Sequence, residues 1–502
     1  MLKYLAKILS NPPKLNSSEN SAHATPLGKD LGANISQLKS KLKGSSDIIF
    51  YEFTDPSHNK GLLTYISGFV ETDLLDRDIL TPLLTKTGPD KKNFLYTSAV
   101  RTISSFEEAI GGILDGNVLL LMNGDETAFL LSIPKQVQRS VDEPDSESVV
   151  RGPKEGFVES IKTNLLLLRR KIKSPNLKIE TRKIGRITQT EIALVYIEGI
   201  VDPEVLKEVR KRLSKIKIDS VLETGYIEQY IQDHKYSPYA TVGNTQKPDV
   251  VAGKILEGRV AIFCDGTPHV LTVPYLYIEN LQTSEDYYVR TLNASLLRLL
   301  RITGLFVSTL LPGIYVALST YHQEMLPTVL LVTIAGAREG IPLPAFAEAL
   351  VMGVMFELLK ESGTRLPRAI GSAISIVGAL VIGDAAVNAG LVSAPLVIVT
   401  AITAVSSFIL PSFTESMTIF RLIFFILGGV AGLIGITCGI FFIMIYTVSI
   451  RSFGIPYTAP LSSASENNLK DTFLRFPLRS MKNKPAFTAG NNTKRRGGTN
   501  PK

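Results

Sequence analysis

The sequence has few cysteines and none of the short motifs that mark common catalytic or metal sites. Cys264 and Cys438 are its two cysteines, and they lie in different regions, so they form neither a disulfide framework nor a cysteine-based metal site. The motifs HExxH, GxSxG and CxxC are missing, as is a phosphate loop ending in GK[ST]. The five histidines are scattered along the chain. We therefore predict that the protein is not an enzyme and has no catalytic residue, metal ion or cofactor.

Charged residues are missing from three long stretches in the second half of the chain. Ile302–Tyr321, Leu391–Thr414 and Leu422–Ile450 run for twenty, twenty-four and twenty-nine residues without a charge. A helix needs about 20 apolar residues to cross the hydrocarbon core of a bilayer. The pattern predicts a helical membrane domain over residues 286–450. LLPG at Leu310–Gly313 predicts a bend within the first span, because proline interrupts the helical hydrogen bonding.

The apolar run at the N-terminus, MLKYLAKILSNPPK, is too short and too interrupted for a secretory signal. We therefore expect the roughly 290 residues ahead of the first span, which we call the soluble part, to stay in the cytoplasm. Residues 1–46 are rich in polar and small residues and are predicted to be flexible. The tail, residues 451–502, carries ten Lys or Arg and two acidic residues, which is typical of the cytoplasmic side of a membrane. Its few aromatics and its many Pro and Gly residues favour a solvated anchor over nucleic-acid binding. The number of crossings should then be even. We count four, plus partial elements at Met325–Ala337 and Phe346–Glu361.

One pattern occurs twice in the soluble part. ALVYIEGIV at Ala193–Val201 echoes LLTYISGFV at Leu62–Val70. Further along, ILEGRVAIFCDGTPHVLTVP at Ile255–Pro274 echoes ILDGNVLLLMNGDETAFLLSIP at Ile113–Pro134. Each half closes with a predicted hairpin turned by Asn-Gly or Asp-Gly, dipeptides that accept positive φ. The repetition predicts two α/β subdomains of similar plan.

The predicted fold class is α+β: a multi-domain membrane protein with two similar α/β cytoplasmic subdomains followed by an α-helical transmembrane bundle. The subdomains occupy residues 47–147 and 191–285, and a connector occupies residues 148–190. Within the connector, Gly156–Lys173 carries apolar residues at helical spacing and is predicted to form an amphipathic helix that clamps the two halves together. Its apolar stripe consists of Phe157, Ile161, Leu165 and Leu168.

Small residues recur at helical spacing within Ala369–Gly390. Such a stripe permits close helix packing, and it equally suits the lining of a narrow pore, so both interpretations stay open. The candidate pore-lining residues are Ser372, Ser375, Ala379, Gly383 and Ala386. Ionisable or polar groups at membrane depth are costly and suggest function. The intramembrane polar candidates are Asp384 and Asn388, one turn apart on a different face, together with Glu348 and Glu357.

Several long stretches resemble the A subunits of GerA-type spore germination receptors. Among them are EPDSESVVRGPKEGF at Glu143–Phe157, LEGRVAIFCDGTPHVLTVP at Leu256–Pro274 and ELLKESGTRLPRAIGSAISIVGALVIGDAAVNAGLVSAPLVIV at Glu357–Val399. The resemblance runs over about residues 48–461, through SFGIPYTAPL after Arg451. The chain departs from the family where it has Asp384 and Asn388, at which the family often has Gln and Glu.

The resemblance implies a receptor complex in the inner membrane of a bacterial spore. The expected partners are a transporter-like B-type subunit, which would bind nutrients, and a C-type lipoprotein. Copies of the A subunit are expected to oligomerise, with a pentamer as the expected number, into a nutrient-gated channel that releases monovalent cations and triggers germination. The soluble part and the tail would face the spore core, membrane lipids would surround the helices, and no nucleic acid would be bound.

Two other functions are compatible with the residues. Broken segments around Pro312, Met325–Ala337 and IPLP at Ile341–Pro344 suit a secondary transporter, although the membrane block shows no internal repeat. The large soluble part suits a membrane-anchored sensor or scaffold subunit of the same complex.

Overall fold

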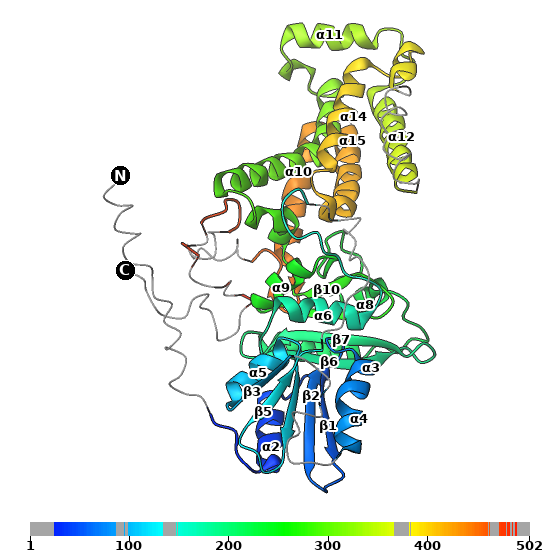
Figure 1. Cartoon of the computed structure of the whole chain (residues 1–502). Coiled ribbons are helices and arrows are strands. Elements are labelled where there is room, and N and C mark those ends of the chain that lie inside the picture. The colour runs from blue at the N-terminus through cyan, green and yellow to red at the C-terminus, as the bar shows by residue number, and fades with distance from the viewer. Residues whose placement is uncertain are drawn as a thin grey trace, which may run out of the picture.

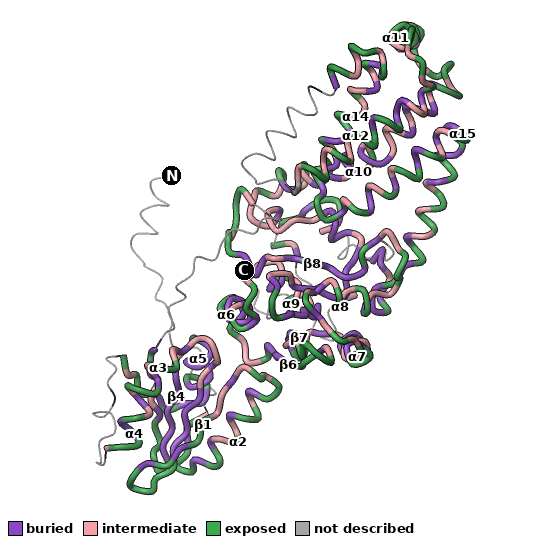
Figure 2. The backbone as a smooth tube through the Cα atoms, turned by 90° about the vertical axis from the view of Figure 1, so that its right-hand side faces the viewer, coloured by how far each residue is buried: buried purple, intermediate pink, exposed green. Residues whose placement is uncertain are grey.

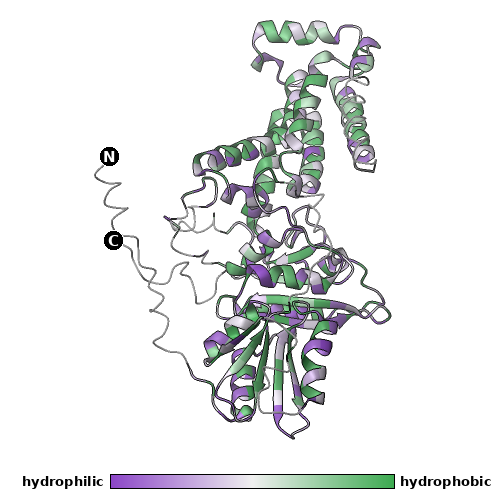
Figure 3. Cartoon of the chain, in the orientation of Figure 1, coloured by the Kyte–Doolittle hydropathy of each residue, from purple (hydrophilic) through white to green (hydrophobic). Residues whose placement is uncertain are grey.

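The computed structural model describes residues 25–86, 95, 99–133, 147, 149–365, 381, 383–459, 461, 471–477, 479–481, 484 and 487–488. Two sheet-containing subdomains lie at one end of the molecule, and a group of helices lies at the other end (Figure 1). The helices of this second group are largely apolar (Figure 3).

The first subdomain is a five-stranded antiparallel sheet with helices on both faces. Its strands are β1 (Ile48–Thr54), β2 (Lys60–Ile66), β3 (Val100–Ile103), β4 (Val118–Met122) and β5 (Ala128–Leu131), in the order β1-β2-β4-β5-β3. The helices α2 (Leu31–Lys41) and α5 (Phe106–Leu114) pack on one face. The segment α3 (Thr72–Leu75), η1 (Asp76–Leu80) and α4 (Thr81–Thr85) packs on the other. Alternate residues of each strand therefore enter two separate cores.

The expectation of a flexible lead-in through residue 46 is wrong for the part that the structure describes. Helix α2 begins after Asp30, whose carboxylate accepts a hydrogen bond from Gly32 N at 2.9 Å and so caps the helix. Leu31 and Leu38 are buried in the first subdomain. The polar composition did not indicate a helix here, because these leucines recur only once every two turns.

The second subdomain has the same plan. Its strands are β6 (Leu177–Ile184), β7 (Thr190–Ile197), β8 (Gly243–Thr245), β9 (Val260–Cys264) and β10 (Val270–Val273), in the order β6-β7-β9-β10-β8. The helices α7 (Pro203–Ser214) and α8 (Thr224–Ile231) cover one face, and α6 (Ile161–Lys171) and α9 (Pro248–Leu256) cover the other. Gly124 and Gly266 turn the equivalent hairpins at φ values of 90° and 89°. The sequence repeat thus corresponds to a repeated sheet topology.

The connector helix α6 is shorter than predicted and begins at Ile161, but its apolar stripe is buried as predicted. The helix also ties the two subdomains together. The buried Arg169 donates to both carboxylate oxygens of Asp47, at 2.9 and 3.1 Å, just before β1. Beside it, Ser46 N donates to Ile179 O at 2.9 Å, so the chain entering the first sheet pairs with the edge strand β6.

The helical domain consists, over its described residues, of α10 (Thr291–Thr320), α11 (Thr328–Arg338), α12 (Ala345–Arg365), α14 (Ala394–Ser407) and α15 (Thr414–Ser449). By length and composition, α10 and the segment Pro411–Ser449 could cross a membrane. Helix α10 continues through Pro312. Helix α14 is shorter than the predicted span over Leu391–Thr414, because the chain leaves it for a 3-10 turn at Pro411–Phe413.

Helix α15 is two helical arms that meet at Gly432, which has φ 61° and ψ −148°. The ring of Tyr239 lies 4.9 Å from that of Phe420 and 6.3 Å from that of Tyr446. A straight helix would separate Phe420 and Tyr446 by about 39 Å, so the chain must fold back on itself. The prediction that Leu422–Ile450 forms a single crossing is therefore wrong. Each arm is about 26 Å long, close to the thickness of a bilayer core.

The described part of the tail is docked on the protein, in contrast to the solvated anchor that its composition predicts. The strands β11 (Arg451–Ser452) and β12 (Ile455–Pro456) form a hairpin, and the buried Tyr457 follows it. Tyr277 N donates to Tyr457 O at 2.9 Å. Further along, Asp471 contacts the beginning of α10. The tail and the soluble part therefore lie at the same end of the helical domain.

Candidate functional site: polar groups of the helical domain and its junction with the soluble part

Glu348 is fully buried between three helices of the helical domain. It lies in the first turn of α12 and accepts a hydrogen bond from Ser393 N at the beginning of α14. Tyr315 on α10 reaches Ser393 Oγ at 3.3 Å. Arg338 Nε, at the end of α11, lies 3.6 Å from the other oxygen of Glu348. This carboxylate therefore links α11, α12 and α14 at the end of the domain remote from the soluble part.

Glu357, about two and a half turns further along α12, is half-buried and paired. One of its oxygens lies 2.7 Å from Arg421 Nη2 on the first arm of α15, and the other lies 3.3 Å from Lys360 Nζ. The two acidic candidates on α12 are thus placed apart, and each joins α12 to a neighbouring element.

The small-residue segment is described only in part, and Ser372, Ser375 and Ala379 lie outside the described residues. Gly383 is buried, and a Cβ atom there would lie 3.4 Å from Val397 on α14. Ala386 packs against the same group of helices. Asp384 and Asn388 are exposed on the opposite face. The structure therefore separates a packed face of small residues from an exposed polar face.

Two glycines bring α10 and α15 into backbone contact. A Cβ atom at Gly313 would lie 2.5 Å from Phe424 O, and a Cβ atom at Gly428 would lie 2.5 Å from Gly313 O. Small residues allow helices to approach this closely. At the reversal of α15, the hydroxyl of Tyr321 donates to Gly429 O at 2.9 Å or to Val430 O at 3.1 Å, and so satisfies carbonyls at the end of the first arm.

An aromatic cluster joins the soluble part to both ends of α15, and no local pattern in the sequence predicts it. Its centre is Tyr239, a buried residue between α8 and β8. The Tyr239 hydroxyl lies 2.8 Å from Thr447 Oγ1 near the end of the second arm. Five rings surround that of Tyr239 at centroid distances of 4.9–6.3 Å: Tyr277, Phe413, Phe420, Tyr446 and Tyr457. Burial raises the pKa of Tyr239, so its hydroxyl stays neutral.

A buried ionic cluster joins the beginning of α10 to the soluble part and the tail. Asp286 Oδ2 lies 2.9 Å from Arg298 Nε, and Asp286 Oδ1 lies 2.8 Å from Arg301 Nη1. Arg298 Nη1 also lies 2.9 Å from Asp471 Oδ1. Asp286 and Arg298 are both fully buried. We call Asp286, Arg298, Arg301 and Asp471 the junction cluster; its two positive and two negative charges balance.

Tyr287 and Tyr288, just before α10, both donate hydrogen bonds to carboxylates of the protein. The hydroxyl of Tyr287 donates to Asp471 Oδ2 at 2.7 Å, and that of Tyr288 donates to Asp249 Oδ2 at 2.6 Å. These side chains therefore bind protein partners.

Glu228 on α8 lies close to acidic residues at the same junction. Desolvation and the nearby charges of Glu415 and Glu223 raise the pKa of Glu228 to about 7. Glu415 belongs to the first turn of α15, and Ser416 Oγ donates to Pro238 O at 2.5 Å beside it. Ionisation of Glu228 therefore places two like charges between the soluble part and α15.

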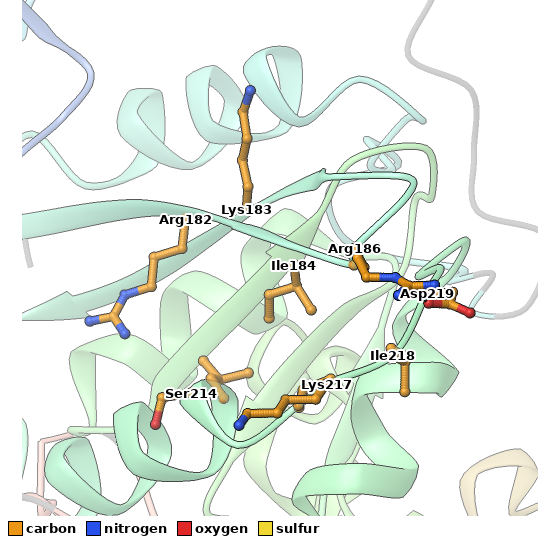
Figure 4. Close-up of a pocket in the computed structure, with 11 residues that line it drawn as sticks. Arg182, Lys183, Ile184, Arg186, Ser214, Lys217, Ile218 and Asp219 are labelled. Atoms are coloured by element: carbon orange, nitrogen blue, oxygen red, sulfur yellow. Dashed lines mark ion pairs between the residues drawn. The ribbon is translucent and has the colours of Figure 1, made fainter.

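A shallow groove of about 600 Å³ lies where β6 ends beside the loop after α7 (Figure 4). Its cationic residues do not converge: Arg182 and Arg186 point in opposite directions, and Lys183 points away from Lys217. Arg186 Nε is already paired with Asp219 Oδ1 at 2.9 Å. The groove therefore lacks the arrangement of a built ligand site.

Comparison with known proteins identifies the family. The family model for Bacillus/Clostridium GerA spore germination protein matches residues 36–487. The chain is 43% identical to spore germination protein KA of Bacillus subtilis (strain 168) over 463 residues, which cover 90% of this chain and 85% of that protein. It is 38% identical to spore germination protein A1 of the same organism, over 91% of this chain and 92% of the relative.

A solved structure is also similar to part of this chain. It is the crystal structure of the N-terminal domain of the A subunit of the Bacillus megaterium spore germinant receptor GerK3, which is 35% identical. The match covers 51% of this chain and 98% of the solved chain, with a TM-score of 0.40. From the family model and the extent of the curated matches, the chain belongs to the Bacillus/Clostridium GerA spore germination protein family.

Proposed function

We propose that this chain is the A subunit of a nutrient-germinant receptor in the spore inner membrane, and that copies of it surround an ion-conducting pore. Pore opening would release monovalent cations and so trigger germination. The partners would be a transporter-like B-type subunit, a lipid-anchored C-type subunit and further copies of this chain, with a pentamer as the expected assembly. The family membership supports the role in germination, and the pore is the further step of the proposal.

The observation that carries the pore proposal is the exposed polar face formed by Asp384 and Asn388. A carboxylate at membrane depth requires water or a polar partner, because its transfer into lipid is costly. Gly383 and Ala386 pack inward on α14, so the opposite, polar face is the one available to line a passage. By their spacing, Ser372, Ser375 and Ala379 belong to the same stripe as Gly383 and Ala386, so the proposed lining is the polar face of Asp384 and Asn388.

The helical surfaces support assembly in a membrane. Large apolar residues are exposed along α11, α14 and α15, including Val329, Val405 and Ile445. Figure 2 shows exposed segments along these helices. Contiguous exposed apolar surface marks contact with lipid or protein. Since both ends of α15 and the described tail lie beside the soluble part, we place the soluble part and the tail together on the cytoplasmic side.

Electrical recording from the complete receptor, reconstituted with its B-type and C-type subunits, tests the proposal. Nutrient should evoke discrete current steps carried by monovalent cations. Asp384→Lys should reduce both cation preference and cation conductance, because it places a positive charge at the passage. Asp219→Lys, an equal charge change in the soluble part, should alter neither. Saturable flux without current steps, or unchanged selectivity in correctly assembled Asp384→Lys receptors, would contradict the pore.

A further inference from the structure

The first three turns of α10 have an inverted amphipathic pattern. Ala294, Arg298 and Arg301 recur at helical spacing and are buried. The opposite face carries Leu292, Leu296, Leu299 and Leu300, which are 88%, 57%, 46% and 50% exposed. The charged residues therefore lie inside and the leucines lie outside, the reverse of a helix on a water-soluble protein.

The buried face cannot turn outward. Its arginines belong to the junction cluster, in which each lies within 2.9 Å of Asp286. Arg298 also reaches Asp471 in the tail at 2.9 Å. Rotating the helix would separate these buried charges without replacing their partners, which is strongly unfavourable. The orientation of the leucine face is thus fixed by the ionic contacts on the other side of the helix.

The leucine face runs without interruption into the candidate span. Helix α10 extends to Thr320, and its exposed stripe passes through Thr303 to Phe306, which is 55% exposed. Arg290, which immediately precedes the helix, is exposed and would meet anionic headgroups if these leucines lay among acyl chains. This continuity with the span, together with the terminal cation, favours lipid over a protein partner.

We propose that the face formed by Leu292, Leu296, Leu299 and Leu300 is a lipid-binding surface, seated in the acyl layer just below the headgroups of the cytoplasmic leaflet. The soluble part is then fixed against the membrane surface by one helix that binds lipid on one side and the junction cluster on the other. This inference rests on the membrane placement in the proposed function, and it is independent of whether the protein conducts ions.

The sequence contains no tryptophan, so single-tryptophan variants report one position each. Full-length Leu296→Trp and Leu299→Trp would be reconstituted in vesicles of phosphatidylcholine and phosphatidylglycerol, with and without bromine on the acyl chains near the headgroup. Both variants should lose most of their emission in the brominated vesicles and resist aqueous iodide. Both positions are exposed, so the larger ring should be accommodated, and elution at the size of the unsubstituted protein checks this.

Two further variants calibrate the measurement. Phe442→Trp, at a residue of the second arm of α15 that is 72% exposed, reports insertion of the helical domain. Tyr51→Trp, on β1, should respond only to iodide. Quenching by bromine at Phe442→Trp but not at position 296 or 299 would overturn the lipid surface alone. If neither bromine nor iodide quenches the emission at positions 296 and 299, the leucines are covered by a second copy of the chain or by another subunit. If brominated lipid also fails to quench Phe442→Trp, the placement of the helical domain in the membrane is overturned.

Discussion

Tyr239 and Thr447 lie 208 positions apart in the sequence, and their side-chain oxygens are 2.8 Å apart. The same tyrosine ring packs on Phe420, near the beginning of α15. One residue of the soluble part therefore contacts both ends of a helical hairpin whose turn lies at the opposite end of the helical domain. A displacement of the loop that carries Tyr239 would move both arms together, which makes this contact a direct mechanical link between the soluble part and the helices.

Replacing Tyr239 should weaken this link in two graded steps. Tyr239→Phe removes the hydrogen bond to Thr447 and should cost about 0.5–1.5 kcal/mol of unfolding free energy. Tyr239→Ala also removes the ring and should cost about 3–5 kcal/mol. Thermal unfolding in detergent would measure both. Tyr230→Phe, on an exposed tyrosine of α8, is the matched control and should be neutral. Equal stability of Tyr239→Ala and the unsubstituted protein would show that the cluster does not join the two parts.

The contact between Gly313 and Gly428 predicts strong sensitivity to a single methyl group. Gly313→Ala places a Cβ atom 2.5 Å from Phe424 O, so α10 and α15 must separate. We expect a loss of about 1–3 kcal/mol, as in other overpacked sites. Gly353→Ala on α12, where a Cβ atom has no described neighbour within 4 Å, should be neutral or stabilising by up to about 1 kcal/mol. Heating the two variants side by side and measuring the protein that stays monodisperse would compare them, and the reverse ranking would refute the close helix crossing.

The fold of the soluble part could largely be predicted from local sequence patterns. The strand runs, the Asn123-Gly124 turn and the charge-free stretch before Tyr321 all depend on residues that are neighbours in the sequence. The contacts between the soluble part and the helical domain could not be predicted in this way. Tyr239 acquires its partners from Tyr277, Phe413 and more distant positions, and Asp471 stands in a tail whose composition suggests solvation. These contacts depend on how remote segments meet, which periodicity does not encode.

The residues of the candidate site could likewise be predicted only in part. Glu348 and Glu357 stood out because acidic residues are rare in apolar helices, but their different partners could not be inferred. The reversal at Gly432 was hidden because the turn is made of glycine and apolar residues, without a polar break. The one available signal was the run of glycines in GGVAGLIG, within a stretch too long for a single crossing.

The junction cluster predicts that removing one buried charge opens the beginning of α10. Asp286→Asn leaves Arg298 and Arg301 facing each other with one carboxylate lost, and should destabilise this region by about 3–5 kcal/mol. Because trypsin cleaves after arginine, mass analysis of a brief digest should show new cuts after these two residues. Asp219→Asn breaks an exposed pair with Arg186 and should cost about 0–1 kcal/mol, without new cuts in α10. Unchanged digestion of Asp286→Asn would mean that the cluster does not hold the helix in place.

Glu228 predicts a specific pH dependence. Its pKa is raised from 4.5 to about 7 in the folded protein, so folding favours the protonated carboxyl. The resulting contribution to stability is fully present below pH 4.5, declines as the pH rises, and is lost above pH 7. Glu228→Gln keeps a neutral side chain at every pH, so it should match the unsubstituted protein near pH 4.5 and exceed its stability at pH 8, on the order of 1–3 kcal/mol. Glu204→Gln, on the exposed face of α7, should leave the pH profile unchanged. Melting temperatures of the full-length protein across this range would decide the matter: parallel profiles for Glu228→Gln and the unsubstituted chain would mean that the carboxylate is not held near Glu415.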